Sequence, residues 1–203
     1  SNQASVTLTL SADTALTAIF EKDPAPPPPP PPPPATPAGL RNVALGATAT
    51  QSSTAGAAAA SLAVDGDRSG APAASSLALT NSEANPWWQV DLGRAVDIHS
   101  AQLYNRTDCC GERMSNVVVL ISEQDMTGRS YSSLLADPAI TRVQHAPPMG
   151  GRLIVPLQVK GRYLRVQLAE TNALSLAEGQ VLALPTDPLV PDQSLLRNLA
   201  LGR

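Results

Sequence analysis

Short runs of apolar and alternating residues, separated by turn-forming residues, fill residues 40–185 and most constrain the fold. Each run has the length and pattern of a β-strand, and Gly, Pro, Asn, Asp and Ser lie between the runs. No amphipathic stretch of helical length competes with them. Runs at this density are typical of two packed antiparallel sheets. We therefore predict an all-β domain, an antiparallel β-sandwich, with strands within residues 44–51, 87–93, 99–105, 116–122, 151–159, 162–168 and 178–184.

The segment before this domain divides into two parts. Residues 1–23 contain SVTLTL and ALTAIF around SADT, a pattern that predicts a β-hairpin and weakly resembles the closing hairpin of small β-repeats on bacterial surface proteins. The alternative is a tail without structure. Residues 24–39 hold nine consecutive prolines, Pro26 to Pro34, which lack amide donors. Polyproline II at ~3.1 Å per residue makes them a stiff spacer of roughly 28 Å, or a ligand for a proline-binding domain.

A repeated segment predicts further domains in the parent protein. LRNVALG at residues 40–46 recurs as LRNLALG at residues 196–202. The recurrence at a domain-sized interval predicts a linker over residues 186–195 and the start of a second copy at residues 196–203, although a chance match is the alternative. We therefore expect tandem copies in a longer, modular bacterial protein.

The densest polar motif is NRTDCCGERMS, which sets Arg106, Asp108 and Arg113 around two adjacent cysteines. The Cα atoms of Cys109 and Cys110 are ~3.8 Å apart across a trans peptide, too close for ordinary disulfide geometry. They form either a strained eight-membered ring or two free thiols in a reducing compartment. An arginine donates several directed hydrogen bonds, and Asp108 is placed to hold one of the guanidinium groups. The motif predicts a polar binding site, with a surface ion network as the alternative.

Together with NPWWQVDLG at residues 85–93, this motif resembles the F-type lectins, the fucose-binding family first known from eel serum. The resemblance covers the predicted sandwich and implies a jelly-roll related to discoidin and galactose-binding domains. It implies that Cys109 and Cys110 form a vicinal disulfide, a flat apolar patch against the sugar, and hence an exported protein. It further implies that Arg106 and Arg113 bind an axial hydroxyl and the ring oxygen of L-fucose.

The chain departs from the family pattern in the loop before NPWW. Leu79 stands where the family has a histidine, and an unpaired sugar hydroxyl against it costs about 1 to 3 kcal/mol. We expect fucose affinity to fall about tenfold to a hundredfold, or the site to have moved to another sugar or been lost. His99 and His145 are at the wrong spacing to replace the histidine. Leu77 and Ala177 stand where many family members have a disulfide, which predicts an apolar contact there.

Two adjacent tryptophans follow this loop. A strand presents successive side chains on opposite faces, so one of Trp87 and Trp88 is expected to pack in the core and the other to cover a loop. The resemblance implies the same structural use. A sugar-stacking platform is the alternative.

A calcium site is the second feature that the resemblance implies. LAVDGDRSG places Asp65 and Asp67 on a tight turn with a glycine, an oxygen-rich loop that a hard cation prefers, although DGD is also a common turn. The resemblance gives calcium the role of pinning the loops beside the sugar. The ligand set that it implies is the Leu62 carbonyl, Asp65, Asp67, Ser76, the Ala177 carbonyl and the Glu178 side chain.

Charge and motif content argue against other functional classes. The net charge is −3 and no run of Lys and Arg exists, which argues against a nucleic-acid partner. No apolar run approaches the ~20 residues that cross a bilayer, and the first residues lack a signal-peptide pattern, so a secretion signal would lie upstream. The sequence has no GxSxG, HExxH or glycine-rich phosphate loop, and Asp65 and Asp67 are too crowded for a glycosidase pair.

These observations predict a non-catalytic, calcium-stabilised, extracellular lectin module that binds terminal L-fucose or a related sugar. The alternative is a structural or adhesive sandwich of a bacterial surface protein that has lost fucose binding. Retention of Arg106, Asp108, Arg113 and the two cysteines favours the lectin, whereas Leu79 favours the alternative.

Overall fold

The computed structural model describes residues 39–71 and 76–184, which lie in one compact unit. The predicted hairpin, the proline spacer up to residue 38, and the predicted linker and second copy over residues 186–203 lie outside the described residues. The bounds of the sandwich domain, residues 40 and 185, stay a prediction.

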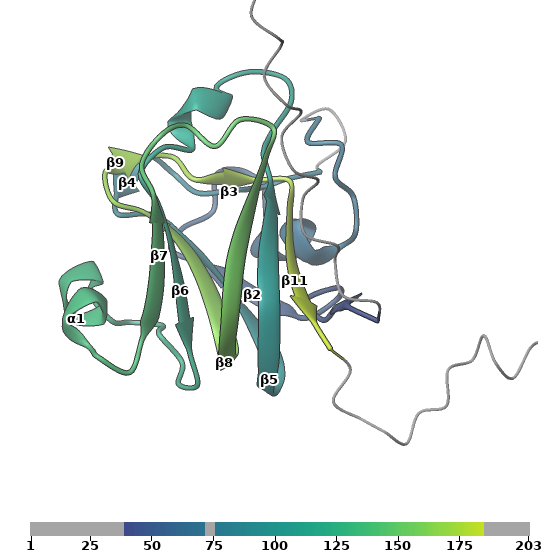
Figure 1. Ribbon diagram of the computed structural model, residues 1–203. Helices are drawn as coiled ribbons and strands as arrows, with labels where there is room; N and C mark the ends of the chain where they lie inside the picture. Colours follow the sequence, from purple (N-terminus) through teal and green to yellow (C-terminus); the bar gives the residue numbers. More distant parts are fainter. Residues whose placement is uncertain (1–38, 72–75, 185–203) are drawn as a thin grey trace, which may run out of the picture. The chain divides into compact units, whose positions relative to one another are not determined.

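The described part of the chain is nearly all β-structure, and all of its strand pairings are antiparallel (Figure 1). Among these residues, no helix has the length and apolar character to cross a bilayer. The elements are β1 Arg41–Asn42, β2 Thr48–Gln51, the 3₁₀ helix η1 Ala60–Val64, β3 Ala78–Leu79, β4 Glu83–Ala84, β5 Trp87–Tyr104, the 3₁₀ helix η3 Gly111–Arg113, β6 Val117–Ser122, α1 Tyr131–Ala136, β7 Thr141–His145, β8 Arg152–Leu168, β9 Thr171–Asn172, β10 Ser175–Leu176 and β11 Glu178–Ala183.

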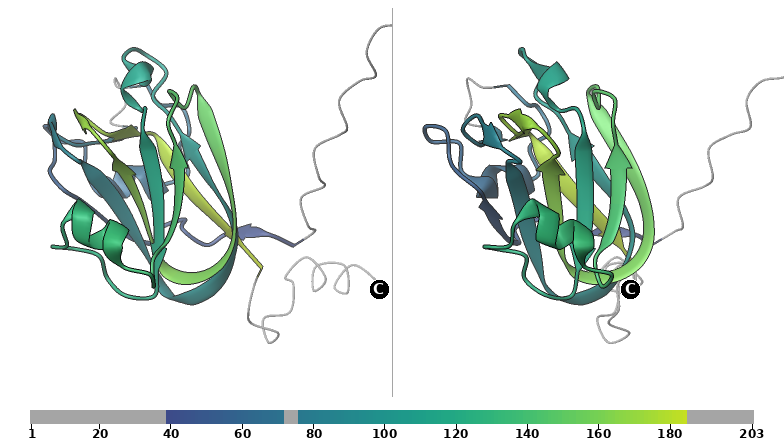
Figure 2. Two further views of the ribbon diagram at one scale, coloured as in Figure 1. Left: turned by 60° about the vertical axis from the view of Figure 1, so that its left-hand side comes forward. Right: turned by 90° about the vertical axis from the view of Figure 1, so that its left-hand side faces the viewer.

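Two long strands, β5 and β8, organise the main sheet, whose order is β1-β11-β5-β8-β6-β7. Strand β2 pairs with the first half of β5, whereas β11 pairs with its second half. Each of the two long strands joins two runs that the sequence predicted as separate strands. The β5–β8 pairing shifts register between Asp91 and Val96, around Gly93 at φ 77°. There the strands bend rather than end, and the sheet folds over itself (Figure 2). The predicted antiparallel β-sandwich is confirmed.

The core lies between the two halves of this bent sheet. Trp88 and Val90 from the first half of β5 belong to the same buried cluster as Leu103 from its second half and Val181 of β11. Trp88 is fully buried, and its Nε1 donates to the Ala60 carbonyl at 2.9 Å. The sequence therefore predicted correctly that one indole packs in the core.

The other indole lies on the opposite face, as strand alternation requires. Trp87 is half-buried, and the guanidinium of Arg165 lies 4.1 Å from the centroid of its ring. Arg165 is itself fully buried, and its Nε and Nη2 donate to Gln89 Oε1 at 3.2 and 3.1 Å. Trp87 thus covers a buried charge of the neighbouring strand, where the sequence predicted that it would cover a loop.

A second buried cluster, on the outer face of β6, explains why all six residues of that strand are buried. Leu120 packs there with Leu134 of α1. The helix begins after Ser130, whose Oγ accepts from the Ser133 amide at 3.2 Å. Helix α1 and strand β7 were not predicted, since six residues are too few to establish a helical period.

Candidate functional site

The loops at one end of the sandwich line an open cavity of about 440 Å³. Residues 105–112, which run from the end of β5 into η3, line one side. Pro148, Gly150 and Gly151, from the loop between β7 and β8, line the other. The predicted polar motif therefore lines a cavity almost entirely by itself.

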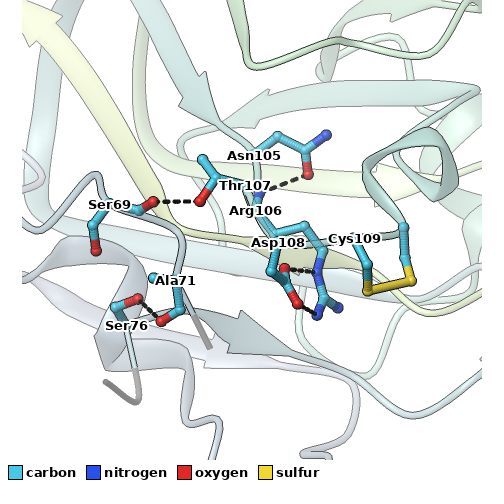
Figure 3. Close-up of polar contacts among 9 residues, drawn as sticks. Ser69, Ala71, Ser76, Asn105, Arg106, Thr107, Asp108 and Cys109 are labelled. Carbon is cyan, nitrogen blue, oxygen red and sulfur yellow. Dashed lines mark hydrogen bonds and ion pairs between the residues drawn. A yellow bond between two sulfur atoms is a disulfide. The ribbon is translucent and has the colours of Figure 1, made fainter. Parts of the chain in front are cut away.

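Arg106 is the charged centre of this cavity. Its Nε donates to Asp108 Oδ1 at 2.8 Å and its Nη2 donates to Oδ2 at 2.7 Å, so the two planar groups form a paired bridge (Figure 3). The Arg106 side chain is only 10% exposed. These hydrogen bonds hold the pKa of Asp108 well below its usual range and raise the pKa of Arg106. The guanidinium is therefore charged and fixed in direction.

The predicted vicinal disulfide between Cys109 and Cys110 is present (Figure 3) and lines the cavity beside Arg106. Cys110 adopts the left-handed backbone conformation with φ 60° and precedes η3. Its carbonyl accepts from the Arg113 amide at 3.2 Å, which closes the turn. The cavity thus presents an apolar sulfur edge next to directed cationic donors.

Asn105 joins the two loops of the cavity, and the sequence analysis did not single it out. It is 2% exposed, and its Nδ2 donates to the Gly111 carbonyl at 2.9 Å and to the Gly150 carbonyl at 3.0 Å. Its Oδ1 accepts from the Arg106 amide at 2.9 Å. The sequence gives no signal that Asn105 joins two loops, because its side chain bonds to backbone carbonyl groups, and any residue has such a group.

The segment after the DGD turn packs against the arginine-bearing loop. The Thr107 amide donates to the Gly70 carbonyl at 3.1 Å, and Thr107 Oγ1 donates to the Ser69 carbonyl at 2.8 Å (Figure 3). Gly70 is buried, and a Cβ atom there would lie 2.7 Å from the Asn105 carbonyl oxygen and 3.0 Å from Arg106 Cα. The predicted cation loop and the predicted binding loop are therefore in direct backbone contact.

Two residues predicted for the binding site do not line the cavity. Arg113 ends η3 and its side chain is exposed. Leu79 lies in β3, half-buried, where it pairs with Ser175 of β10. The Leu79 carbonyl accepts from the Ala55 amide at 2.9 Å. The structure thus brings Arg106, Asp108 and the disulfide together, whereas Arg113 and Leu79 lie outside this set.

Leu77 and Ala177, at the positions of the family disulfide, are both buried. The β3–β10 ladder pairs Leu79 with Ser175 and Ala78 with Leu176, so the next step of the register places Leu77 opposite Ala177. Apolar packing at these positions agrees with the predicted replacement of the disulfide.

The predicted side-chain ligands of calcium are Asp65, Asp67, Ser76 and Glu178. The turn that carries Asp65 and Asp67 contacts Glu178. Asp65 Oδ1 accepts from the Asp67 amide and Asp67 Oδ1 from the Ser69 amide, both at 2.8 Å. The Gly66 amide donates to Glu178 Oε2 at 3.3 Å. Glu178 is fully buried, and its Oε1 has no hydrogen-bond partner among the described residues. Burial, together with the charge of Asp65, raises the pKa of Glu178 to about 7.

The other predicted ligands lie nearby in the chain. Leu62 is within η1, directly before the turn, and Ala177 directly precedes β11. Ser76 is buried and its Oγ donates to the Ala71 carbonyl at 2.6 Å. Within residues 39–71 and 76–184, no three His, Cys, Asp or Glu side chains gather to hold a metal ion. A cation here would therefore depend partly on carbonyl and hydroxyl oxygens.

Known proteins similar to this chain bear on the same region. Residues 62–166 match the family described as NedA-like, galactose-binding domain. Fucolectin-1 of Anguilla japonica is 36% identical over 154 residues, covering 70% of this chain and 81% of its own length. The fucolectin of Anguilla anguilla is 34% identical over 142 residues, covering 64% of this chain and 90% of its own.

Solved structures agree with the sequence relatives. The lectin domain of lectinolysin, complexed with Lewis b antigen, has a TM-score of 0.61 at 35% identity, covering 70% of this chain and 95% of that domain. The fucolectin from serum of Morone saxatilis has a TM-score of 0.60 at 34% identity, covering 71% of this chain and 49% of that one. A galactose-bound carbohydrate-binding module of C. perfringens NanJ, at 16% identity and TM-score 0.51, supports the fold alone.

Proposed function

This chain belongs to the fucolectin family of galactose-binding-like domains, and on that basis we propose that it is a carbohydrate-binding module for terminal L-fucose or a related sugar. The observation that carries the proposal is the cavity in which Arg106, fixed by Asp108, adjoins the Cys109–Cys110 disulfide. The relatives include lectins named for fucose and a lectin domain complexed with Lewis b antigen, and they support fucosylated glycans as the ligand class.

The chemistry of the cavity suits a sugar ring. A pyranose has a polar rim of hydroxyl groups and apolar C–H faces, so a binding site needs directed hydrogen bonds beside an apolar surface. Arg106 uses Nε and Nη2 for Asp108, which leaves Nη1 and further donor directions toward the cavity. The sulfur atoms of Cys109 and Cys110 supply the apolar surface. This division of roles suits binding of a sugar, since the Asp108 carboxylate is engaged by Arg106 rather than directed at a glycosidic bond.

A calcium ion is part of the proposal because the orphaned carboxylate fits one. Glu178 is fully buried with one oxygen unpartnered, and the exposed Asp65 and Asp67 lie on the turn that its other oxygen contacts. A hard cation would satisfy such oxygens and keep the carboxylates charged. When bound, calcium would supply positive charge to the turn that packs against Thr107. The residues proposed to hold it are the Leu62 carbonyl, Asp65, Asp67, Ser76, the Ala177 carbonyl and Glu178.

A second candidate function is a structural or adhesive sandwich that keeps the fold without binding fucose. The observation that favours it is the placement of Arg113 and Leu79 outside the lining of the cavity. Of the two predicted arginines, only Arg106 lines the cavity, and no histidine does. Each hydrogen bond that the sugar loses lowers the affinity for fucose. The two candidates therefore differ in the affinity for fucose and not in the fold.

The surroundings of the module are proposed as extracellular, with tandem copies in the parent chain. The disulfide supports an oxidising compartment. In the first LRNVALG segment, Asn42 Oδ1 accepts from the Val181 amide at 3.1 Å, so this segment closes the sheet against β11. The similar segment LRNLALG at residues 196–202 would do so in a second copy, and two copies would gain avidity for a glycan-coated surface.

Calorimetric titration of the 203-residue protein with L-fucose and D-galactose tests the proposal, with calcium and with a chelator. Arg106→Lys keeps the charge and loses the planar fork, and Arg94→Lys, at an exposed arginine outside the cavity, is the matched control. We expect fucose binding that Arg106→Lys abolishes and Arg94→Lys leaves unchanged. No heat with either sugar from folded, calcium-loaded protein would contradict the lectin and favour the structural candidate.

A further inference from the structure

A groove on the outer face of the sheet lies away from the cavity of the disulfide loop. It has a volume of about 320 Å³ and is lined by Val118, Tyr131, Leu135, Arg142 and Gln144. We call it the α1 groove. Helix α1 and the η3 turn lie at opposite ends of the strands (Figures 1 and 2), so the α1 groove is separate from the proposed fucose site.

The periodicities of its elements build the α1 groove. Tyr131 and Leu135 are four residues apart on α1, so they lie on one face of the helix. Arg142 and Gln144 are two residues apart on β7, so both project from the outer face of the strand. Gln144 pairs with Val118 of β6, which forms the apolar floor. An aromatic and an apolar side chain therefore face two planar polar side chains across this floor.

The charge of the groove is positive and has no counter-ion in its lining. Arg142 Nη1 donates to the Leu135 carbonyl at 3.0 Å, which anchors the guanidinium at the groove. The ion pairs among the described residues do not include Arg142. The nearby Asp137 is bound by Arg129 at 2.9 Å. Arg142 is thus a held cation whose remaining donors are available to an anion.

The other lining groups select the kind of anion. The hydroxyl of Tyr131 is protonated at neutral pH, as for any tyrosine, and burial raises its pKa further, so it is able to donate. Leu135 and the tyrosine ring offer apolar surface beside the buried Val118, which a bare inorganic anion does not use. A volume of about 320 Å³ lies at the lower end of the range for small-molecule sites, of roughly 300 to 1,000 Å³, and accommodates one ring.

We propose that the α1 groove binds an acidic monosaccharide, a sugar ring that carries a carboxylate, as a second saccharide site of this domain. Arg142 binds the carboxylate through its guanidinium, Gln144 and the Tyr131 hydroxyl bind ring hydroxyls, and the apolar floor contacts a C–H face. Uronic acids and sialic acids share this chemistry. The site does not depend on the fucose proposal, since none of its residues lines the disulfide cavity.

Titration of the 203-residue protein, followed by NMR or calorimetry, tests the proposal with D-glucuronate and with N-acetylneuraminate. D-glucose is the neutral counterpart of glucuronate, and inorganic phosphate is the anion without a ring. We expect at least one acidic sugar to bind more tightly than glucose and phosphate by about tenfold, the effect of one charge-assisted contact. Binding of neither acidic sugar, or equal binding of glucose or phosphate, would overturn the proposal.

Variants locate the binding. Arg142→Gln is expected to weaken the acidic sugar about tenfold or more and to leave L-fucose binding unchanged. Gln144→Ala, at an exposed strand position, is a second variant that keeps the test valid if Arg142→Gln unfolds. Arg94→Gln removes the same charge from an exposed position outside the groove. Equal losses with Arg142→Gln and Arg94→Gln would assign the effect to net charge and overturn the site.

Discussion

Gly70→Ala is expected to disturb the fucose site although Gly70 does not line it. A Cβ at this position would lie 2.7 Å from the Asn105 carbonyl oxygen, whereas ordinary van der Waals contact begins at 3.4 Å. The two loops must separate by the difference, 3.4 − 2.7, or about 0.7 Å, to accept the methyl group. The atoms in contact are backbone atoms of the segment that carries Arg106, so no flexible side chain can give way.

The magnitude follows from two separate costs. Gly70 has φ 61°, and an alanine in the left-handed region costs about 1 to 2 kcal/mol in folding free energy. Overpacking against the neighbouring backbone adds about 1 to 3 kcal/mol. A binding constellation tolerates shifts of about 0.5 Å, so a displacement of Arg106 by about 0.7 Å is expected to weaken fucose binding about tenfold.

Gly56→Ala separates the two costs. Gly56 has φ 60°, nearly the same as Gly70, and a Cβ there meets nothing within 4 Å. Urea unfolding and fucose titration of both variants give the comparison. We expect Gly56→Ala to lose only the backbone cost and to keep its fucose affinity. Equal stability and equal affinity in the two variants would refute the argument that the contact with the Ser69–Gly70 segment positions Arg106.

Three further outcomes are expected. Asn105→Ala removes the hydrogen bonds that join both loops of the cavity, so we expect the free energy of unfolding in urea to fall by about 1 to 3 kcal/mol and fucose binding to weaken. The control Asn81→Ala, at an exposed loop position, should change neither quantity. Because Arg106 depresses the pKa of Asp108 below its ordinary 3.8, the carboxylate stays charged above that pH, and the bridge is lost only as pH falls through the lowered value. With saturating calcium, which would keep Glu178 charged, fucose affinity measured from pH 8 to pH 5 should therefore be flat, and a decline centred near pH 6 in the calcium-loaded protein would contradict this assignment. Calcium should raise the melting temperature of the protein and a chelator should reverse the rise, and Asp65→Asn should reduce the increment; an unchanged melting temperature would remove calcium from the proposal.

The strands were predictable because the pattern of each run is local in sequence. It was not predictable that two successive runs form one continuous strand. The runs at residues 87–93 and 99–105 alternate correctly, yet they are one strand. The first run ends at Gly93, which has φ 77°, and the residues that follow it look like a turn in sequence. Only pairing with β8 on both sides of the bend keeps the backbone extended there. Tertiary pairing thus overrode a local turn signal.

The binding motif was predictable for a related reason, since its chemistry is contiguous. Arg106, Asp108 and the two cysteines lie in one short segment, so the polar side of the cavity is local in sequence, whereas its other side comes from the distant Pro148–Gly151 loop. Asn105 and Gly70 escaped notice because their partners are backbone groups of segments distant in sequence. The α1 groove escaped notice because α1 and β7 are too short to give a periodic signal.

Leu79, at the position of the family histidine, and the disulfide loop are held in place by different hydrogen bonds. Leu79 belongs to β3, whose backbone is bonded to the Ala55 segment and to β10, whereas the disulfide loop is held by Asn105 and by the Ser69–Gly70 contact. These two sets of bonds have no residue in common. Leucine in place of the family histidine at position 79 therefore leaves intact the bonds that hold Arg106 and the disulfide. Weakened fucose binding at an intact cavity is therefore the outcome that we expect, and complete loss would require a further change in the loop that carries Arg106.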